Sequence, residues 1–399
     1  MSGAASPIEI LYLTHNYPRF AGDFAGAFIA RLAEKTSESG RPVGVLAPHH
    51  RDANPDGIMG GVRVWRFRYG SDDQETLAYQ GDLGKIQLAG RKGLAAHYRF
   101  MRSFARAAQS VATSEAPRII HAHWWVPAGV IARKLRFSGP VIVTLHGTDM
   151  RLLRAKRWLR PLARRVLARA SAITVVSSWL GSSLREMFPD VEGKLQVIPM
   201  PPNDDAFRRK ESLPPSGHAP LILSVTRFTT QKRNTVFLEA LALLHDQGVA
   251  FRARLIGDGP LRTQISAQIE SSGLSDYVTL LKPVGQKELA AEYRAADVAV
   301  LPSVDEGFGM ALVEAQMCGT VTIGVRSGGL CDIVQDGVNG LLAEPDQAAD
   351  LARALQRLLS DVSLRTRLAD AGWRSAVENF STVAIVRKFG QLYDAGRAE

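Results

Sequence analysis

Short apolar runs rich in β-branched residues alternate with helix-length stretches along most of the chain. Strands separated by helices form parallel sheets that the helices cover. Six such runs lie in the first half, at residues 8–13, 43–46, 62–67, 119–122, 141–145 and 173–176. Five more lie in the second half, at residues 221–225, 253–256, 278–281, 298–301 and 321–325. The alternation therefore predicts an α/β protein with two parallel sheets.

A proline-rich, charged segment at residues 199–220 interrupts this alternation. Proline and a dense charged run disfavour both helix and strand, so this segment is expected to link two domains. A chain of 399 residues with 46% hydrophobic content has enough apolar residues for two cores. We expect an N-terminal domain at 1–200, a linker at 201–219 and a C-terminal domain at 220–376. Residues 377–399 should pack back on the N-terminal domain, with an amphipathic helix at 381–393 capped by Ser381.

Composition limits the partners and the compartment. The net charge of +10 favours an anionic partner: nucleic acid, acidic lipid or a phosphate-bearing small molecule. The two cysteines, Cys318 and Cys331, provide neither a disulfide framework nor a zinc site, which fits a reducing compartment. No signal-peptide pattern and no apolar run near the roughly 20 residues of a spanning helix occurs. A cytoplasmic location is expected, with a peripheral position at the inner face of a membrane left open.

The segment from Pro302 to Glu314 follows the strand expected at 298–301 and contains a glycine turn and then a helix start. Gly307 and Gly309 allow a tight turn with outward N–H groups, and the helix start adds a positive dipole end, which together favour a bound phosphate. Two carboxylates about two helical turns apart could reach one cleft from different depths. The alternative is an ordinary glycine turn with Glu314 on a solvated helix face.

Two cations follow the strand expected at 221–225. Arg227 and Lys232 would lie at a carboxyl strand end, where open α/β sheets bind ligands. A diphosphate requires cations of this kind. A solvated basic pair in a surface loop is the alternative.

Together, Arg227, Lys232 and the spacing of Glu306 and Glu314, an E-x7-E pattern, resemble the retaining glycosyltransferase family 4. Residues 144–149, 255–260 and 328–341 also resemble blocks of that family. The resemblance implies the GT-B fold: two Rossmann-like domains with a cleft between them, the first binding the acceptor and the second the nucleotide sugar.

The same resemblance implies roles for particular residues. Arg227 and Lys232 would hold the donor diphosphate, Glu314 the ribose hydroxyls, and Glu306 with the backbone of 307–310 the sugar ring. His146 would lie beside the reacting sugar, although a histidine that is simply hydrogen-bonded at a strand end is the alternative. The expected catalytic residues are thus His146, Arg227, Lys232 and Glu306. The expected donor-binding residues are Gly22, Asp149, Gly257, Gly307, Phe308, Gly309, Met310, Leu312 and Glu314.

Some positions depart from the family pattern or allow a second interpretation. Gly22 and Gly26 are spaced apart where many relatives have adjacent glycines, and Asp332 stands where the family usually has glutamate. Asp149 could instead cap the helix that follows it. His121 and His123 lie on one face of a strand and could bind a metal, but lining a cleft is favoured because the sequence offers no third ligand. No Asp-x-Asp occurs, so no metal and no cofactor are expected.

Residues 151–172 combine eight arginine or lysine side chains with apolar residues at helical spacing. This pattern is typical of a basic amphipathic helix. The helix could bind an anionic membrane surface, or it could be a solvated helix packed on its sheet.

These observations predict retaining transfer of a hexose from a UDP- or GDP-sugar to a hydroxyl of a glycolipid or polysaccharide precursor. An epimerase or phosphorylase on the same architecture, or a nucleotide- or nucleic-acid-binding protein, remains the alternative. The run Gly257-Asp258-Gly259-Pro260 lacks the third glycine of a dinucleotide fingerprint, and the chain has no Gly-Lys-Ser/Thr phosphate loop. The arginines are not interleaved with stacking aromatics, so nucleic acid is not the expected partner.

Overall fold

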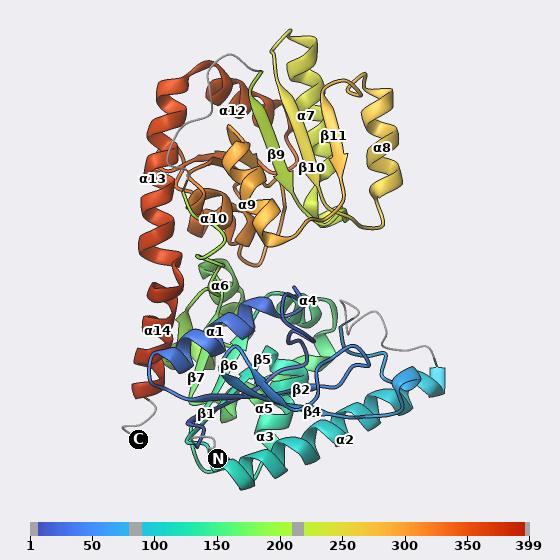
Figure 1. The fold of residues 1–399 in the computed structure, drawn as a ribbon, viewed down its shortest axis with the longest axis vertical. Helices are drawn as coiled ribbons and strands as arrows, with labels where there is room; N and C mark the ends of the chain where they lie inside the picture. Colours follow the sequence, from blue (N-terminus) through green and yellow to red (C-terminus); the bar gives the residue numbers. More distant parts are fainter. Residues whose placement is uncertain (1–6, 80–89, 210–218, 396–399) are drawn as a thin grey trace. The chain divides into compact units, whose positions relative to one another are not determined.

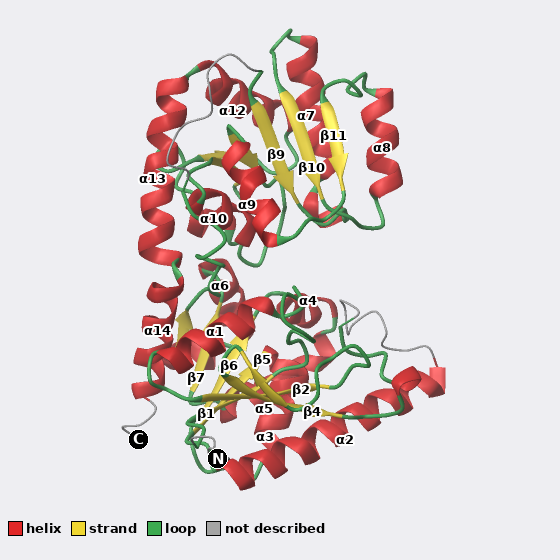
Figure 2. Ribbon diagram, viewed as in Figure 1, coloured by secondary structure: helices red, strands yellow, loops and turns green. Residues whose placement is uncertain are grey.

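A computed structural model describes residues 7–79, 90–209 and 219–395 of the chain. The described chain forms two compact units (Figure 1). Unit 1 comprises Met1–Pro201 with Ile385–Glu399, and unit 2 comprises Pro202–Ala384. Figure 2 shows helices packed along the strands of each unit, as the alternation in the sequence predicts.

Unit 1 contains a sheet with the strand order β3-β4-β2-β1-β5-β6-β7-β8. Its strands are parallel except for β3, which pairs antiparallel with β4. The six predicted strands are confirmed to within two residues at each end, while the three-residue strands β3 and β8 were not predicted because they carry little periodic signal. The strands are β1 Ile10–Leu13, β2 Val43–Pro48, β3 Gly57–Met59, β4 Val62–Phe67, β5 Ile119–His123, β6 Val141–Leu145, β7 Ala172–Val175 and β8 Leu195–Val197.

Helices cover this sheet, and the central strands β1, β2, β5 and β6 are buried along their whole length. Such two-sided burial explains why these strands read as continuous apolar runs rather than as alternating ones. The helices are α1 Ala27–Glu38, α2 Gly90–Glu115, α3 Val130–Lys134, α4 Thr148–Ala155, α5 Arg160–Arg169 and α6 Ser178–Met187. Short turns lie at η1 Asp72–Gln74, η2 Trp124–Gly129, η3 Arg157–Leu159 and η4 Pro189–Lys194.

The basic segment 151–172 is not the single helix that was predicted. It contains the end of α4, the turn η3, α5 and the first residue of β7. Lys156 leaves the helical region, with φ −123° and ψ 74°, and Pro161 stands in the first turn of α5. Proline has no N–H for a helical bond and is favoured at a helix start, so the break falls just before it.

Unit 2 contains a fully parallel sheet with the order β11-β10-β9-β12-β13-β14. All five predicted strands are confirmed, and the three-residue β14 was missed. The strands are β9 Leu221–Val225, β10 Arg252–Ile256, β11 Val278–Leu281, β12 Val298–Val300, β13 Val321–Val325 and β14 Leu341–Ala343. The helices are α7 Asn234–Asp246, α8 Arg262–Ser271, α9 Gln286–Ala295, α10 Met310–Met317, α11 Leu330–Ile333, α12 Ala348–Ser360 and α13 Val362–Phe380, with the turn η5 Thr230–Lys232.

Each sheet has a point at which the direction of strand addition reverses. In unit 2 the chain adds strands outward from β9 to β11 and then restarts at β12 on the other side of β9. In unit 1 the corresponding point lies between β1 and β5. Open α/β sheets bind ligands outside the carboxyl ends of the strands at such reversals. The loops after β9 and β12, and those after β1 and β5, are therefore the places to look for a site.

The segments that join the units differ in part from the prediction. Residues at the start of the expected 201–219 linker pack on unit 2: Phe207 is buried, with its ring 5.9 Å from that of Tyr293, and Arg209 stacks over Trp373. Residues 210–218 lie outside the described part. The expected boundary at 377 is wrong because α13 continues to Phe380, whose ring packs on Phe308 of unit 2.

The last helix, α14, spans Thr382–Ala395 and packs on unit 1 from Ile385 onward. The predicted serine cap is confirmed, since the Ser381 hydroxyl accepts a hydrogen bond from the Ala384 N–H at 3.3 Å. None of the described helices combines the length and the apolar content that crossing a bilayer requires.

Candidate active site

The loop after β9 presents the two predicted cations of unit 2 differently. Arg227 is exposed, and its side chain has no hydrogen-bond or ion-pair partner among the described residues. Lys232 ends the turn η5 and forms an ion pair with Glu306, in which both side chains are less than one-fifth exposed. The loops after β9 and β12 are also joined by the bond from the Val304 N–H to the Gln231 carbonyl, at 3.1 Å. Lys232 and Glu306 thus meet at the strand reversal of unit 2, and Arg227 lies in the same loop as Lys232.

The turn after β12 depends on close backbone contacts. Gly309 is the N-cap of α10 with φ 109°, and a Cβ on it would lie 2.4 Å from Leu330 Cδ2. A Cβ on Gly328 would lie 2.5 Å from the Glu306 carbonyl oxygen, and the Gly329 N–H donates to that oxygen at 2.8 Å. The glycines therefore hold Glu306 beside the N-terminus of α10, whose first N–H groups have no helical partner.

The remaining predicted residues near α10 divide into exposed and buried positions. Gly307, Met310 and Glu314 are half-buried. Phe308 is buried against Phe380, and Leu312 is 1% exposed, so neither side chain is open to a ligand. Phe308 and Leu312 can therefore contribute to a site only through their backbone atoms.

Glu314 lies beside the phenol of Tyr293, which projects from α9. Burial raises the pKa of Tyr293 well above its ordinary value, and the neighbouring Glu314 carboxylate raises it further. The phenol therefore stays protonated. Tyr293 is a contact of Glu314 that no motif in the sequence indicated.

Gly257 lies after β10, directly against the loop that carries Arg227. A Cβ at Gly257 would lie 1.8 Å from the Thr226 carbonyl oxygen, and a Cβ at Gly259 would lie 2.5 Å from that of Phe228. The Gly257-Asp258-Gly259 run is thus required for close packing of two loops at the carboxyl edge of the sheet.

In unit 1, His146 follows β6 at the turn into α4. The Asp149 carboxylate organises this turn: its Oδ1 accepts from the N–H groups of His146 (3.1 Å), Gly147 (2.9 Å) and Met150 (3.0 Å). The N-cap of α4 is Gly147, so Asp149 lies inside the first turn and is not the cap. Burial raises the pKa of Asp149 to about 6. Its side chain is only 3% exposed, which makes it a support for His146 rather than a ligand-facing group.

Three histidines and a tryptophan form a cluster at the carboxyl ends of β1, β5 and β6. The Trp124 ring lies 4.4 Å from that of His15 and 4.3 Å from that of His146, and its Nε1–H donates to Thr148 at 3.1 Å. His123 Nδ1 lies 3.2 Å from His146 Nε2. Trp124 has φ 69°, a left-handed conformation that is strained for a residue with a large side chain. Such strain is found most often at functional sites.

These imidazoles are held neutral. Burial lowers the pKa of His15 to about 3 and the pKa values of His123 and His146 well below 6.5; His15 lowers the last two further, as do His121 for His123 and His123 for His146. His146 can therefore act as a neutral hydrogen-bonding group but not as an imidazolium at neutral pH.

His121 is a fully buried core residue and does not belong to the part of the histidine cluster that a ligand could reach. Its Nδ1 bonds to the Tyr393 hydroxyl of α14 at 2.9 Å, and its Nε2 bonds to Thr144 at 2.6 Å. Both nitrogens are thus satisfied within the protein, and the His121–His123 pair stacks with ring centroids 4.3 Å apart. The pair does not act as a two-histidine metal site, because His121 has no nitrogen left to offer.

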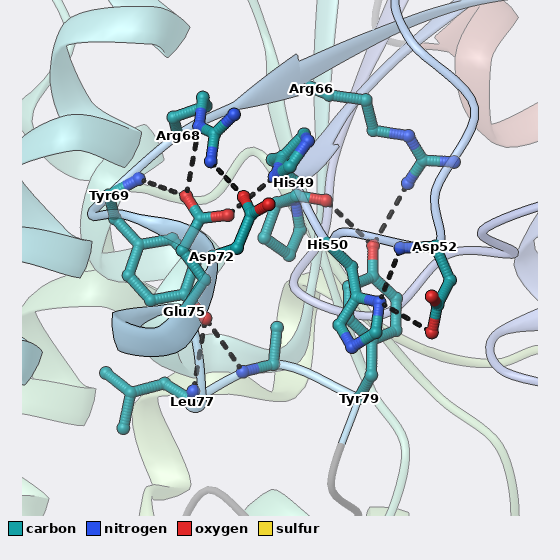
Figure 3. Close-up of polar contacts among 12 residues, drawn as sticks. His49, His50, Asp52, Arg66, Arg68, Tyr69, Asp72, Glu75, Leu77 and Tyr79 are labelled. Carbon is teal, nitrogen blue, oxygen red and sulfur yellow. Dashed lines mark hydrogen bonds and ion pairs between the residues drawn. The ribbon is translucent and has the colours of Figure 1, made fainter.

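One group of possible metal ligands lies elsewhere in the described residues: His49, Asp72 and Glu75, with ligand atoms within 4.8 Å of one another (Figure 3). His49 Nδ1 lies 2.5 Å from Glu75 Oε2, and the Tyr69 N–H donates to Glu75 Oε1 at 2.8 Å. Arg68 forms ion pairs with both Asp72 and Glu75. The Arg68 guanidinium thus bridges the two carboxylates, and these contacts tie the loop after β4 together.

Gly22 is in the loop after β1, exposed, with φ 91° and open space around it. Asp23 beside it is buried and closes the loop by binding Arg19 at 2.7 Å and the Ala25 N–H at 3.3 Å. Nothing else among the described residues converges on Gly22. The structure therefore brings Lys232 and Glu306 together in unit 2, with Arg227 in the same loop as Lys232, and His146 with Asp149 in unit 1.

His15, Trp124 and Tyr293 are candidates that sequence reasoning did not select. The His-x-His-Trp-Trp run at 121–125 was a usable signal, since aromatic residues directly after a strand that bears two histidines lie at the ligand-binding edge. His15 carried no comparable signal because it lies in a loop of mixed composition.

Comparisons with known proteins identify the family and the fold. Residues 205–374 match the family model "Glycosyl transferases group 1", and residues 25–201 match the "Glycosyl transferase 4-like domain". A D-inositol 3-phosphate glycosyltransferase of Streptosporangium roseum is 30% identical over 307 residues, covering 70% of each chain. An N-acetyl-alpha-D-glucosaminyl L-malate synthase of Bacillus anthracis is 27% identical, covering 71% of this chain and 76% of its own.

Solved structures share the fold over almost the whole chain. A sucrose-phosphate synthase of Thermosynechococcus elongatus has a TM-score of 0.77 at 23% identity and covers 98% of this chain and 99% of its own. HepE of Anabaena, solved with UDP and glucose, has a TM-score of 0.72 at 19% identity and covers 97% of this chain and 100% of its own. The predicted class, two parallel-sheet α/β domains of the GT-B type, is thus confirmed. The chain belongs to the GT-B glycosyltransferases of the family 4 type.

Proposed function

We propose that this glycosyltransferase transfers a hexose from a nucleoside diphosphate sugar to an acceptor hydroxyl, with retention of anomeric configuration and without a metal ion. The observation that carries the proposal is the group at the β9–β12 reversal of unit 2. There the Lys232–Glu306 pair lies just before the N-terminus of α10, and the loop that carries Lys232 also carries Arg227, whose exposed side chain has no polar partner among the described residues. Two cations and free N–H groups suit a diphosphate, and a carboxylate suits sugar hydroxyls.

In this proposal each predicted residue has one task. Arg227 and Lys232 bind the diphosphate, Glu314 accepts from the ribose hydroxyls, and Glu306 with the backbone of 307–310 holds the sugar. His146 donates or accepts a hydrogen bond to the transferred sugar. The glycine contacts at Gly257 keep the diphosphate-binding loop in place.

The proposed chemistry is front-face displacement. The bond between the anomeric carbon and the phosphate oxygen breaks, the acceptor oxygen bonds to that carbon, and the departing phosphate oxygen takes the acceptor proton. Arg227 and Lys232 stabilise the charge that develops on the leaving diphosphate, in the way that preorganised cations stabilise transition states. No enzyme nucleophile is needed, and turnover should persist in the presence of a chelator.

Binding and product analysis test the proposal. Thermal shift with UDP, GDP and ADP and with their sugars should identify one nucleotide, because a ligand at 100 times its Kd adds about 2.7 kcal/mol to stability. NMR of the product should show the anomeric configuration of the donor. Absence of a shift with every nucleotide would contradict the donor class. A product formed without acceptor, or only with inorganic phosphate, would indicate an epimerase or a phosphorylase instead.

For the acceptor we propose a glycolipid or polysaccharide precursor, presented at an anionic membrane surface. The support is the basic surface of α4, η3 and α5, which carries exposed Trp158 together with the exposed cations Arg151, Arg154, Lys156, Arg157, Arg164 and Arg165. Cations with an exposed tryptophan are typical of interfacial binding. Sedimentation with anionic vesicles should bring down the protein, and Trp158→Ser should weaken this. Equal sedimentation with neutral vesicles, or none with either, would contradict the membrane role.

A further inference from the structure

The hydrogen bond between His123 and His146 limits the tautomers of both rings. Each imidazole is neutral, so one of the two facing nitrogens, His123 Nδ1 or His146 Nε2, carries a proton and the other carries a lone pair. Two arrangements are possible. They differ in whether the opposite nitrogen of His146, Nδ1, is a donor or an acceptor.

The surroundings of His123 favour one arrangement. His123 is 0% exposed, and its Nε2 is buried without a hydrogen-bond partner among the described residues. A proton on that nitrogen would be a buried donor with no acceptor, and orphaned N–H groups are rarer in proteins than under-satisfied acceptors. The proton of His123 therefore belongs on Nδ1, from which it is donated to His146 Nε2.

Packing fixes the ring in this orientation. His123 stacks on His121 with centroids 4.3 Å apart, and the Tyr12 ring meets it edge-on at 5.0 Å. His121 itself is held at both nitrogens by Tyr393 and Thr144. The bond from His123 is therefore preorganised by the core of unit 1.

From this we infer that His123 is a positioning residue that holds His146 as the Nδ1–H tautomer, so that His146 presents a hydrogen-bond donor to the transferred sugar. His146 is half-buried, and its Nδ1 bonds to no described residue, which leaves that N–H for a ligand. The inference rests on the proposed sugar-transfer function only for the identity of the ligand. The tautomer itself does not depend on it.

Side-chain ¹⁵N NMR on the full chain tests the tautomer directly. In protein labelled with ¹⁵N-histidine, a protonated imidazole nitrogen is well separated from a bare one, and the His146→Gln spectrum identifies the His146 signals by their loss. We expect His146 to be protonated at Nδ1 and bare at Nε2. The reverse assignment in the unmodified protein would overturn the inference, whether or not the protein transfers sugar.

Two near-isosteric variants test the effect on turnover. In His123→Asn the side-chain amide lies where Nδ1 was and keeps a donor there, whereas in His123→Gln the amide reaches the position of Nε2 instead. We expect His123→Asn to keep the His146 tautomer and most of kcat. His123→Gln should lose the single tautomer and about tenfold in kcat, the size of one hydrogen bond, with a smaller change in KM.

Equal kcat in the two variants, with the His146 tautomer changed in only one, would overturn the positioning role. A thermal midpoint measured for each variant separates a loss of folding from a loss of positioning. If no sugar is transferred by any form while the NMR result stands, the proposed function fails and the tautomer assignment does not.

Discussion

Arg227 offers the simplest residue-scale test of diphosphate binding, because its exposed side chain has no hydrogen-bond or ion-pair partner among the described residues. Arg227→Ala should lower turnover about 10²- to 10³-fold, as loss of a transition-state donor does, and leave the thermal midpoint unchanged. Lys232→Ala should lower both the turnover and the thermal midpoint, since it leaves the mostly buried Glu306 carboxylate without its Lys232 partner. Arg353→Ala, which removes an exposed arginine from α12, is the control. Near-normal turnover in both Arg227→Ala and Lys232→Ala would contradict their role.

Gly309 tests whether the turn before α10 requires a residue without a side chain. Gly309→Ala combines φ 109° with a contact of 2.4 Å to Leu330 Cδ2, while Gly337→Ala has φ 73° and open space around its Cβ. We expect Gly337→Ala to cost about 1 kcal/mol of unfolding free energy from backbone strain alone, and Gly309→Ala to cost more, up to about 3 kcal/mol. Urea unfolding of the two variants checks this. Equal losses would mean that Leu330 moves away freely.

At the scale of elements, the central strands of unit 1 were predictable because burial on both faces makes them continuous apolar runs, as in β1, β2, β5 and β6. The three-residue strands β3, β8 and β14 were not, since so short a run carries no periodicity. The break at Lys156 was visible in principle from Pro161, but the amphipathic spacing of the leucines continues across it and indicated one helix. A local break in the backbone can thus leave the apolar face of two successive helices continuous.

The candidate site was predictable where a loop joins a strand to a helix start, as with Lys232 and Glu306. It was not predictable where the contact joins segments distant in sequence. Tyr293 reaches Glu314 from the preceding helix, and His15 reaches Trp124 from a loop more than one hundred residues earlier. Phe308 and Leu312 were included because they lie within the motif, yet both side chains are buried: Phe308 in the turn before α10, against Phe380, and Leu312 on the buried side of α10.

The docking of α14 on unit 1 depends on a buried chain of hydroxyls. The Tyr393 hydroxyl bonds to Tyr12 at 2.7 Å and to His121 Nδ1 at 2.9 Å. Tyr393→Phe removes the Tyr393 bond from the buried Tyr12 hydroxyl and from buried His121 Nδ1, so we expect a loss of about 1–3 kcal/mol in the unfolding free energy, together with faster hydrogen exchange in α14. Tyr98→Phe, on the exposed face of α2, should change neither quantity. No difference between the two variants would show that the chain of hydroxyls does not hold the helix.

At the scale of the whole molecule, buried histidines make the stability of unit 1 depend on pH. Burial lowers the pKa of His121 to about 3 and that of His123 well below 6.5, whereas both would titrate near the ordinary value of about 6.5 when unfolded. Their contribution to stability is therefore complete above pH 6.5 and is lost as the pH falls toward the folded pKa values. Asp149 acts in the opposite direction, because its pKa is raised to about 6: its contribution is complete below about 3.8 and is lost as the pH rises to 6.

His15 and His146 have lowered pKa values as well, so four unfolded histidines take up protons in mild acid against the one proton that folded Asp149 retains, and unit 1 should become less stable there. The urea midpoint followed by tryptophan fluorescence reports mainly on unit 1, since Trp373 is the single tryptophan outside it. We expect the urea midpoint to stay constant from pH 8 to 7 and to fall below pH 6.5. The unfolding free energy should fall by about 1.4 kcal/mol per pH unit for each histidine, before the offset from Asp149. His121→Gln should make the fall of the unfolding free energy with pH less steep, by the contribution of one proton. A flat profile down to pH 5 would mean that the folded unit admits protons to these rings, and the neutral state of His123 and His146 would then have to be abandoned.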